Sequence, residues 1–112
     1  MEKKTLKALE QLFKGTDLQD FDLEGDTAQE LTENIERQID ETEVVYHSVA
    51  MEYLTENDAS LSQSLELANA CGYRAKDLSS EILATLLQQN KLRQVLSELE
   101  DEIEEIYEKS EE

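Results

Sequence analysis

The stretch LRQVLSELEDEIEEIYE, residues 92–108, decides the fold class. Its apolar residues follow one another at intervals of four, three, four and three positions, which is the spacing of a heptad seam on one face of an α-helix. They are Leu92, Leu96, Leu99, Ile103 and Ile106. Because only about two heptads are present, the seam fits either packing inside a domain or a short coiled coil. The sequence lacks Pro and contains three Gly, so the helical bias extends along the chain.

We therefore predict an all-α fold, a single-domain bundle of about four to five helices over residues 1–112 with a long acidic C-terminal helix. Gly15 suits the end of a first helix. Thr27, followed three positions later by Glu30, matches a capping box at the start of another. Polar residues at 88–91 mark a point where the last helix can bend. The predicted elements are a short basic helix at 1–14, an acidic loop at 17–26, and helices at 27–56, 58–71 and 77–109.

The net charge of −18 is distributed unevenly. Residues 1–14 carry +2, residues 17–58 carry −13, residues 59–97 carry +1 and residues 98–112 carry −8. Two acidic blocks therefore flank a nearly neutral centre. An acidic surface of this kind repels nucleic acid and anionic membranes, so we expect any partner to be basic, with no direct contact to nucleic acid or a membrane.

The C-terminal block has a charge density comparable to that of nucleic acid. Nine acids occupy residues 98–112, which as a helix span about 22 Å. Duplex DNA of that length carries about 13 charges, so the block reaches roughly two thirds of its linear density. A solvated tail that only aids solubility is the simpler interpretation. However, Leu99, Ile103 and Ile106 keep an apolar helix face in register through the charge, which a disordered tail does not need.

The sequence indicates no catalytic or metal site. Asp20, Asp22 and Glu24 resemble the first half of an EF-hand loop, but Leu31 stands where the bidentate Glu is required, so an acidic loop before a helix cap is the better interpretation. His47 and Cys71 are the single His and Cys, and we expect a partly buried hydrogen-bonding histidine and a small buried cysteine. No phosphate-binding loop or nucleophile elbow is present. We therefore expect a protein that is not an enzyme, with no cofactor and no metal.

Apolar residues occur on more than one face of the predicted helix at 27–56. Val45, Val49 and Tyr53 are therefore candidates for a homodimer interface, with ordinary core packing as the alternative. No apolar run reaches the roughly 20 residues of a membrane span, and no secretory apolar segment follows the first lysines. Together with the lone cysteine, this predicts a cytoplasmic protein.

The layout resembles a family of small phage antirestriction proteins, the DNA mimics of the Ocr type. The likeness lies in the acidic composition, the helical pattern, the segment VYHSVAM at 45–51 and the ending LSELEDEIEEIYE at 96–108, while the lysine-bearing start departs from it. This resemblance implies a dimer in the host cytoplasm whose carboxylates imitate DNA phosphates and occupy the DNA-binding groove of a defence enzyme.

Two functions from different classes follow as hypotheses. The first is an acidic DNA-mimic inhibitor of a host defence enzyme. The second is a helical adaptor or chaperone that binds a partner protein through the neutral segment 59–97, and a structural phage or filament subunit comes third. The predicted phosphate-mimicking residues are Asp20, Asp22, Glu24, Asp26, Glu30, Glu33, Glu36, Asp40, Glu41, Glu43, Glu98, Glu100, Asp101, Glu102, Glu104, Glu105 and Glu108.

Overall fold

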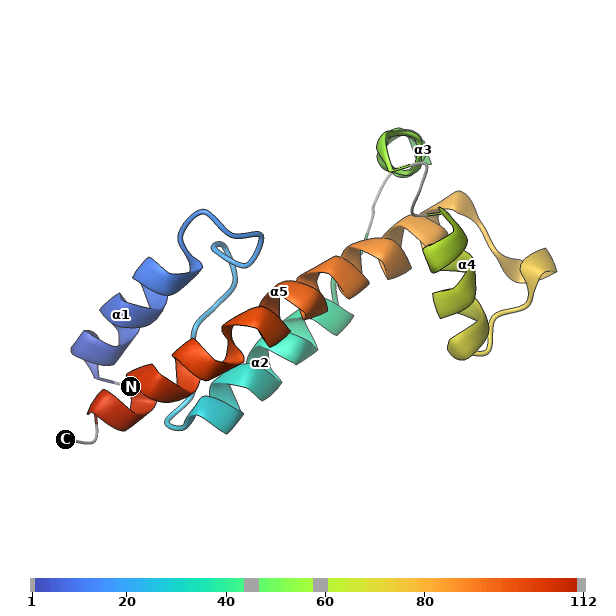
Figure 1. Cartoon of the computed structure of the whole chain (residues 1–112). Coiled ribbons are helices and arrows are strands. Elements are labelled where there is room, and N and C mark those ends of the chain that lie inside the picture. Colours follow the sequence, from blue (N-terminus) through green and yellow to red (C-terminus); the bar gives the residue numbers. More distant parts are fainter. Residues whose placement is uncertain (1, 44–46, 58–60, 111–112) are drawn as a thin grey trace. The chain divides into compact units, whose positions relative to one another are not determined.

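The computed structural model describes residues 2–43, 47–57 and 61–110, and within them it is all-helical, as the sequence predicts. No strand occurs in these residues, and no helix among them is long and apolar enough to cross a membrane. Figure 1 shows the order of the elements. They are α1 (Lys3–Phe13), α2 (Ala28–Asp40), α3 (His47–Glu56), α4 (Leu61–Ala70), the short 3₁₀ helix η2 (Ala75–Asp77) and α5 (Ser80–Ser110).

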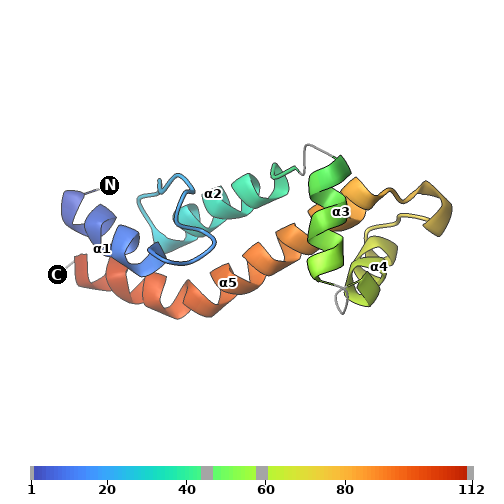
Figure 2. The same cartoon turned by 90° about the horizontal axis from the view of Figure 1, so that it is seen from above.

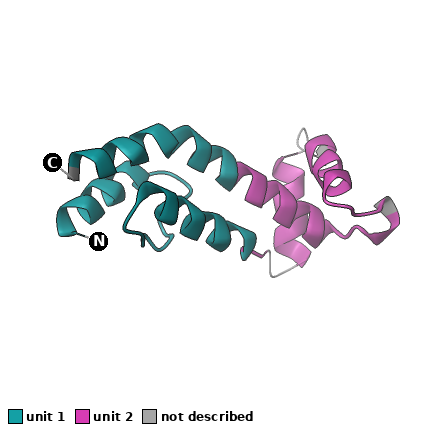
Figure 3. Ribbon diagram, turned by 90° about the horizontal axis from the view of Figure 1, so that it is seen from below, with its two compact units in different colours: residues 1–41, 92–112 teal, residues 42–91 magenta. Residues whose placement is uncertain are grey.

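The chain divides into two compact units, where the sequence pattern predicted one helical domain (Figure 3). Unit 1 comprises residues 1–41 and 92–112, and unit 2 comprises residues 42–91. Unit 2 is therefore an insertion between two parts of the sequence that fold together. Helix α5 contributes its first residues to unit 2 and its acidic remainder to unit 1.

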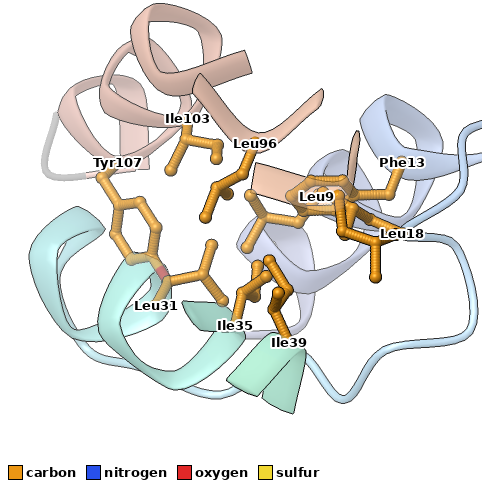
Figure 4. Close-up of a cluster of buried hydrophobic side chains, with 10 residues drawn as sticks. Leu9, Phe13, Leu18, Leu31, Ile35, Ile39, Leu96, Ile103 and Tyr107 are labelled. Carbon is orange, nitrogen blue, oxygen red and sulfur yellow. The ribbon is translucent and has the colours of Figure 1, made fainter. Parts of the chain in front are cut away.

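Unit 1 is built around one apolar cluster, shown in Figure 4. Helix α2 buries Leu31, Ile35 and Ile39, which follow one another at intervals of four residues and therefore lie on one face of the helix. The heptad seam of α5 faces them, and it therefore packs inside the unit. Each fully buried Leu or Ile stabilises the fold by roughly 1.5–3 kcal/mol. The cluster consists of Leu9, Phe13, Leu18, Leu31, Ile35, Ile39, Leu92, Leu96, Ile103 and Tyr107.

The start of α2 confirms the predicted capping residues. The Thr27 hydroxyl oxygen accepts a hydrogen bond from the Glu30 backbone N–H at 3.1 Å. The Glu30 carboxylate in turn accepts one from the backbone N–H of Asp26 at 2.9 Å, one residue earlier than in a standard capping box. Gly25 precedes this turn with φ +156°, and a Cβ there would lie 2.5 Å from the backbone nitrogen of Leu31. The loop therefore approaches α2 at a distance that only glycine allows.

The predicted single helix over 27–56 is wrong. Helix α2 ends at Asp40, the backbone N–H of Glu41 still bonds to Arg37 O at 3.1 Å, and Thr42 and Glu43 are not helical. Acids after a helix C-terminus oppose the helix dipole, and no apolar residue continues the stripe there. The Gln89 side chain donates to the Thr42 carbonyl oxygen at 3.2 Å, which stabilises the non-helical backbone. Helix α3 is a separate element from His47 onward.

The boundaries of the last two helices differ from the prediction by a few residues. Helix α4 begins at Leu61 and ends at Ala70, before Gly72 as predicted, and the predicted helical residues 58–60 lie outside the described part. The N–H of Tyr73 bonds to Ala68 O at 2.9 Å and that of Gly72 to Asn69 O at 3.1 Å, which is a Schellman motif. Helix α5 starts at Ser80 and is helical without interruption through residues 88–91. The 3₁₀ turn before it was not predicted.

Unit 2 has a core of a different kind. Its described buried residues are small or polar apart from Leu87, whereas the large apolar side chains that remain exposed in the described chain all belong to this unit. The buried ones are Ala50, Ser64, Ala68, Ala84, Leu87 and Gln89. The exposed ones are Val49, Met51, Leu65 and Tyr73.

Candidate acidic interaction surface

The structure gathers the predicted phosphate-mimicking residues in unit 1. All seventeen are exposed, and sixteen of them belong to unit 1, the exception being Glu43. Four lie in the loop at residues 20–26, five on α2 and its C-terminal cap, and seven on α5. We call these sixteen residues the acidic surface. They come from three segments that the core of unit 1 holds together.

The charge of the chain follows the division into units. Unit 1 contains 21 of the 28 acids and seven of the ten bases, a net charge of −14. Unit 2 contains the other seven acids and three bases, a net charge of −4. Most of the acid excess therefore lies on the unit with the larger apolar core.

Carboxylates from two helices meet along a groove between α2 and α5, which run side by side in Figures 1 and 2. The groove has a volume of about 420 Å³ and is lined by Ala28, Gln29, Thr32, Glu33, Glu36, Glu100 and Glu104. The amide of Gln29 donates to Glu33 at 3.2 Å. No Lys or Arg lines the groove, and within the described residues none of its four carboxylates lies in an ion pair.

The loop at residues 20–26 alternates exposed acids with partly buried residues. Phe21 and Leu23 pack against the core of unit 1, so the acids at the even positions face solvent. Because the apolar residues anchor every second position, the loop does not need regular secondary structure to fix which side its carboxylates occupy. The exposed acids are Asp20, Asp22, Glu24 and Asp26.

Side chains of α2 and α5 hold the backbone of this loop. Gln38 accepts from the Asp22 N–H and donates to the Asp22 carbonyl, both at 2.9 Å. Asn34 donates to the Glu24 carbonyl at 2.6 Å, and the Tyr107 hydroxyl donates to the Gly25 carbonyl at 2.7 Å. Sequence reasoning missed these positioning residues. The available signal was the pair of amides at positions 34 and 38, which lie one turn apart on α2.

The Tyr107 hydroxyl, which holds the loop, lies close enough to the acidic surface for its carboxylates to change the tyrosine pKa. Burial raises the pKa of its hydroxyl, and the negative charges of Asp26 and Glu30 raise it further. The hydroxyl therefore remains protonated, as a hydrogen-bond donor must be, over the range in which the surrounding carboxylates are ionised.

The basic residues of unit 1 neutralise little of the acidic surface. Arg93 pairs with Asp40, and Lys109 pairs with Glu105 at 3.1 Å, one helical turn away. Exposed pairs of this kind stabilise a protein by about 1 kcal/mol or less. The lysines of α1 are exposed on its outer face, opposite Leu9 and Phe13, and none of them lines the groove.

The other singled-out residues do not form a second site. Within the described residues no three His, Cys, Asp or Glu side chains are gathered as metal ligands. His47 is hydrogen-bonded, with Nδ1 2.8 Å from Glu81 Oε1, but its side chain is 68% exposed, so the expectation of a partly buried histidine is wrong. Cys71 is exposed, not buried, because it follows the end of α4, where Ala68 is the residue that faces inward.

The candidate dimer residues occupy different environments. Val49 is 49% exposed, whereas Tyr53 is partly buried with the Lys91 ammonium 5.4 Å from its ring centre. Val45 lies outside the described residues. Helix α3 thus offers one exposed candidate, and a homodimer remains a prediction.

No family model, curated protein or solved structure matches the chain.

Proposed function

We propose that this chain is an acidic inhibitor that imitates DNA and occupies the nucleic-acid-binding groove of a host defence enzyme. The observation that carries the proposal is the groove between α2 and α5, where Glu33, Glu36, Glu100 and Glu104 converge from two helices without a lining base. Basic side chains of a DNA-binding protein are the complementary chemistry.

The arrangement of the acid supports a contact surface over a solubility coat. A coat has no need for a net charge of −14 on one unit and −4 on the other. It also has no need for Gln38, Asn34 and Tyr107 to hold the backbone that carries the loop carboxylates. A fixed backbone reduces the conformational entropy that the acidic surface loses when it binds.

The mechanism of such an inhibitor is electrostatic and involves no chemical step. Carboxylates of the acidic surface would pair with Arg and Lys side chains that otherwise contact phosphates. The field of unit 1 would steer association, and the affinity would fall steeply as salt rises. Because this chain and double-stranded DNA would occupy the same groove of the enzyme, DNA would compete with the chain for binding.

A binding experiment with matched charge variants tests the proposal. The immobilised chain is incubated with bacterial lysate, and bound proteins are challenged with double-stranded DNA and with increasing NaCl. The groove variant carries Glu33→Gln, Glu36→Gln, Glu100→Gln and Glu104→Gln. The control variant carries Glu52→Gln, Glu56→Gln, Glu66→Gln and Asp77→Asn, exposed acids of unit 2, and changes the net charge equally.

We expect the chain to capture a DNA-binding protein, and we expect DNA and salt to displace it. The affinity of the groove variant for that protein should be at least about tenfold lower than the affinity of the control variant. A complex that is indifferent to DNA and salt would contradict the proposal. Equal losses in the two variants would show that total charge, not the groove, determines binding.

An adaptor that binds a partner protein through residues 59–97 is the second candidate. The observation in its favour is the exposure of Leu65 and Tyr73, at 40% and 41%, in the less acidic unit. The double variant Leu65→Ser, Tyr73→Ser separates the two functions. It would abolish binding to an adaptor's partner and leave a DNA-displaceable complex unchanged.

A further inference from the structure

Unit 2 buries mainly small side chains and leaves large apolar ones exposed, whereas unit 1 buries large apolar side chains. At the contacts of α3, α4 and the start of α5, the buried residues include Ala50, Ala68 and Ala84, whereas Val49 and Met51 are exposed. Small side chains allow helices to approach closely, but they remove little apolar surface from water. The contacts that hold these helices together are therefore weak for the length of chain that they order.

Polar contacts hold α3 near both of its ends. His47, its first residue, lies 2.8 Å from Glu81 in the first turn of α5. Near the other end, the Lys91 ammonium donates to Asn57 Oδ1 at 2.7 Å and lies over the Tyr53 ring. The first of these contacts is exposed and the second is half-buried, and single contacts of either kind stabilise a fold only slightly. Within the described part of α3, Ala50 is the fully buried residue.

The apolar core of unit 1 is complete without any residue of unit 2. Its core consists of residues from α1, the loop at residue 18, α2 and the later part of α5, all within residues 1–41 and 92–112. None of the ten residues of that core belongs to unit 2. Loss of the contacts of α3 and α4 therefore leaves the cluster that positions the acidic surface in place.

From these two observations we propose that α3 and α4 form a releasable arm, which opens as one substructure while α1, α2 and α5 from residue 92 onward stay folded. Proteins open locally where few apolar contacts are buried, and the difference between the two cores places that opening in unit 2. The arm gives the chain a second conformation, in which Ala84 and Leu87 of α5 become accessible without any change in the acidic surface.

Amide hydrogen exchange of the full chain, read by mass spectrometry at neutral pH, tests the arm. Amides of α3 and α4 are expected to have protection factors roughly a hundredfold or more below those of α2 and of α5 after residue 92. Equal protection in the two units would overturn the proposal, because it would mean that the chain opens as a whole.

A pair of neighbouring substitutions on α5 makes the test specific. Lys91→Met keeps the aliphatic stem but removes the contacts to Asn57 and Tyr53, and it is expected to lower the protection of α3 and α4 together roughly three- to tenfold without changing that of α2. Arg93→Met is the control, since Arg93 pairs with Asp40 inside unit 1. If Arg93→Met lowers the protection of α3 and α4 as much as Lys91→Met does, or if Lys91→Met lowers that of α2 equally or that of α3 alone, the two helices do not open together as an independent arm.

Discussion

The hydroxyl of Tyr107 donates a hydrogen bond to the carbonyl oxygen of Gly25, 82 positions earlier in the sequence. This contact joins the last turns of α5 to the acidic loop, at the point where that loop enters α2. Gly25 permits the close approach, and Tyr107 satisfies the carbonyl that the approach leaves facing α5. The two residues therefore determine together where the loop carboxylates lie relative to those of α5.

Replacing Tyr107 by Phe removes this hydrogen bond and leaves the Gly25 carbonyl without its donor. We expect a loss of about 1–2 kcal/mol in the free energy of unfolding, measured by urea titration at neutral pH. Tyr73→Phe is the control, because the Tyr73 side chain is exposed. An unchanged urea midpoint for Tyr107→Phe would mean that solvent replaces the bond at no cost.

Tyr107 also predicts an alkaline limit to stability. Burial, followed by the charges of Asp26 and Glu30, raises its pKa in the folded state above that in the unfolded chain. Its contribution is therefore fully present below the ordinary tyrosine pKa of about 10 and is lost as the pH rises through the higher folded value. Thermal midpoints from pH 9 upward should fall less steeply in Tyr107→Phe than in the parent chain, and parallel curves would refute this assignment.

Gly25→Ala should destabilise unit 1 more than an ordinary glycine replacement does. The new Cβ would lie 2.5 Å from the Leu31 nitrogen, and the φ of +156° is unfavourable for alanine. We expect about 2–4 kcal/mol by urea unfolding. Gly15→Ala, with φ +82° and no atom within 4 Å of its Cβ, reports the backbone conformation alone and should cost only about 1–2 kcal/mol. Equal losses would show that the contact with Leu31 relaxes freely.

The carboxyl group of Glu81 predicts a smaller effect in acid. A backbone hydrogen bond, followed by the interaction with His47, lowers its pKa. The stabilisation is therefore present above the ordinary glutamate pKa of about 4.3 and disappears as the pH falls through the lower folded value. Glu81→Gln should flatten the decline of the thermal midpoint between about pH 5 and pH 3. An unaltered decline would show that ionisation of the Glu81 carboxyl group has no effect on stability.

Periodicity predicted the fold class and the core of unit 1 well, because regular helical spacing and burial coincide there. The seam residues Leu92, Leu96 and Ile103 are buried as the heptad pattern indicates, and Leu31, Ile35 and Ile39 form the facing stripe on α2. The capping role of Thr27 was also readable, since it depends on residues three positions apart.

The errors arose where long-range contacts decide the conformation. Thr42, two residues after the last residue of α2, accepts a hydrogen bond from Gln89, 47 positions away, and no local pattern shows that contact. The predicted acids are exposed and gathered in unit 1, but the residues that orient the loop, Gln38 and Asn34, looked like ordinary polar positions of a helix. The division into two units was invisible because the long helix α5 runs through both.

The acidic surface should lower the free energy of unfolding of the chain. A surface that only supports the fold should raise it, so a stability measurement distinguishes the two roles. Each pair of like charges one turn apart on a helix, such as Glu100 and Glu104, lowers stability by roughly 0.2–0.5 kcal/mol. The groove variant should therefore raise the free energy of unfolding by about 1 kcal/mol at low ionic strength, even as it weakens partner binding. The gain should shrink in 0.5 M NaCl, because salt screens exposed charges. The control variant in unit 2 should gain about half as much, since it removes one like-charge pair one turn apart, Glu52 and Glu56, whereas the groove variant removes two. If the groove variant were instead less stable than the parent chain, its carboxylates would be part of the scaffold, and their presence would no longer require a partner.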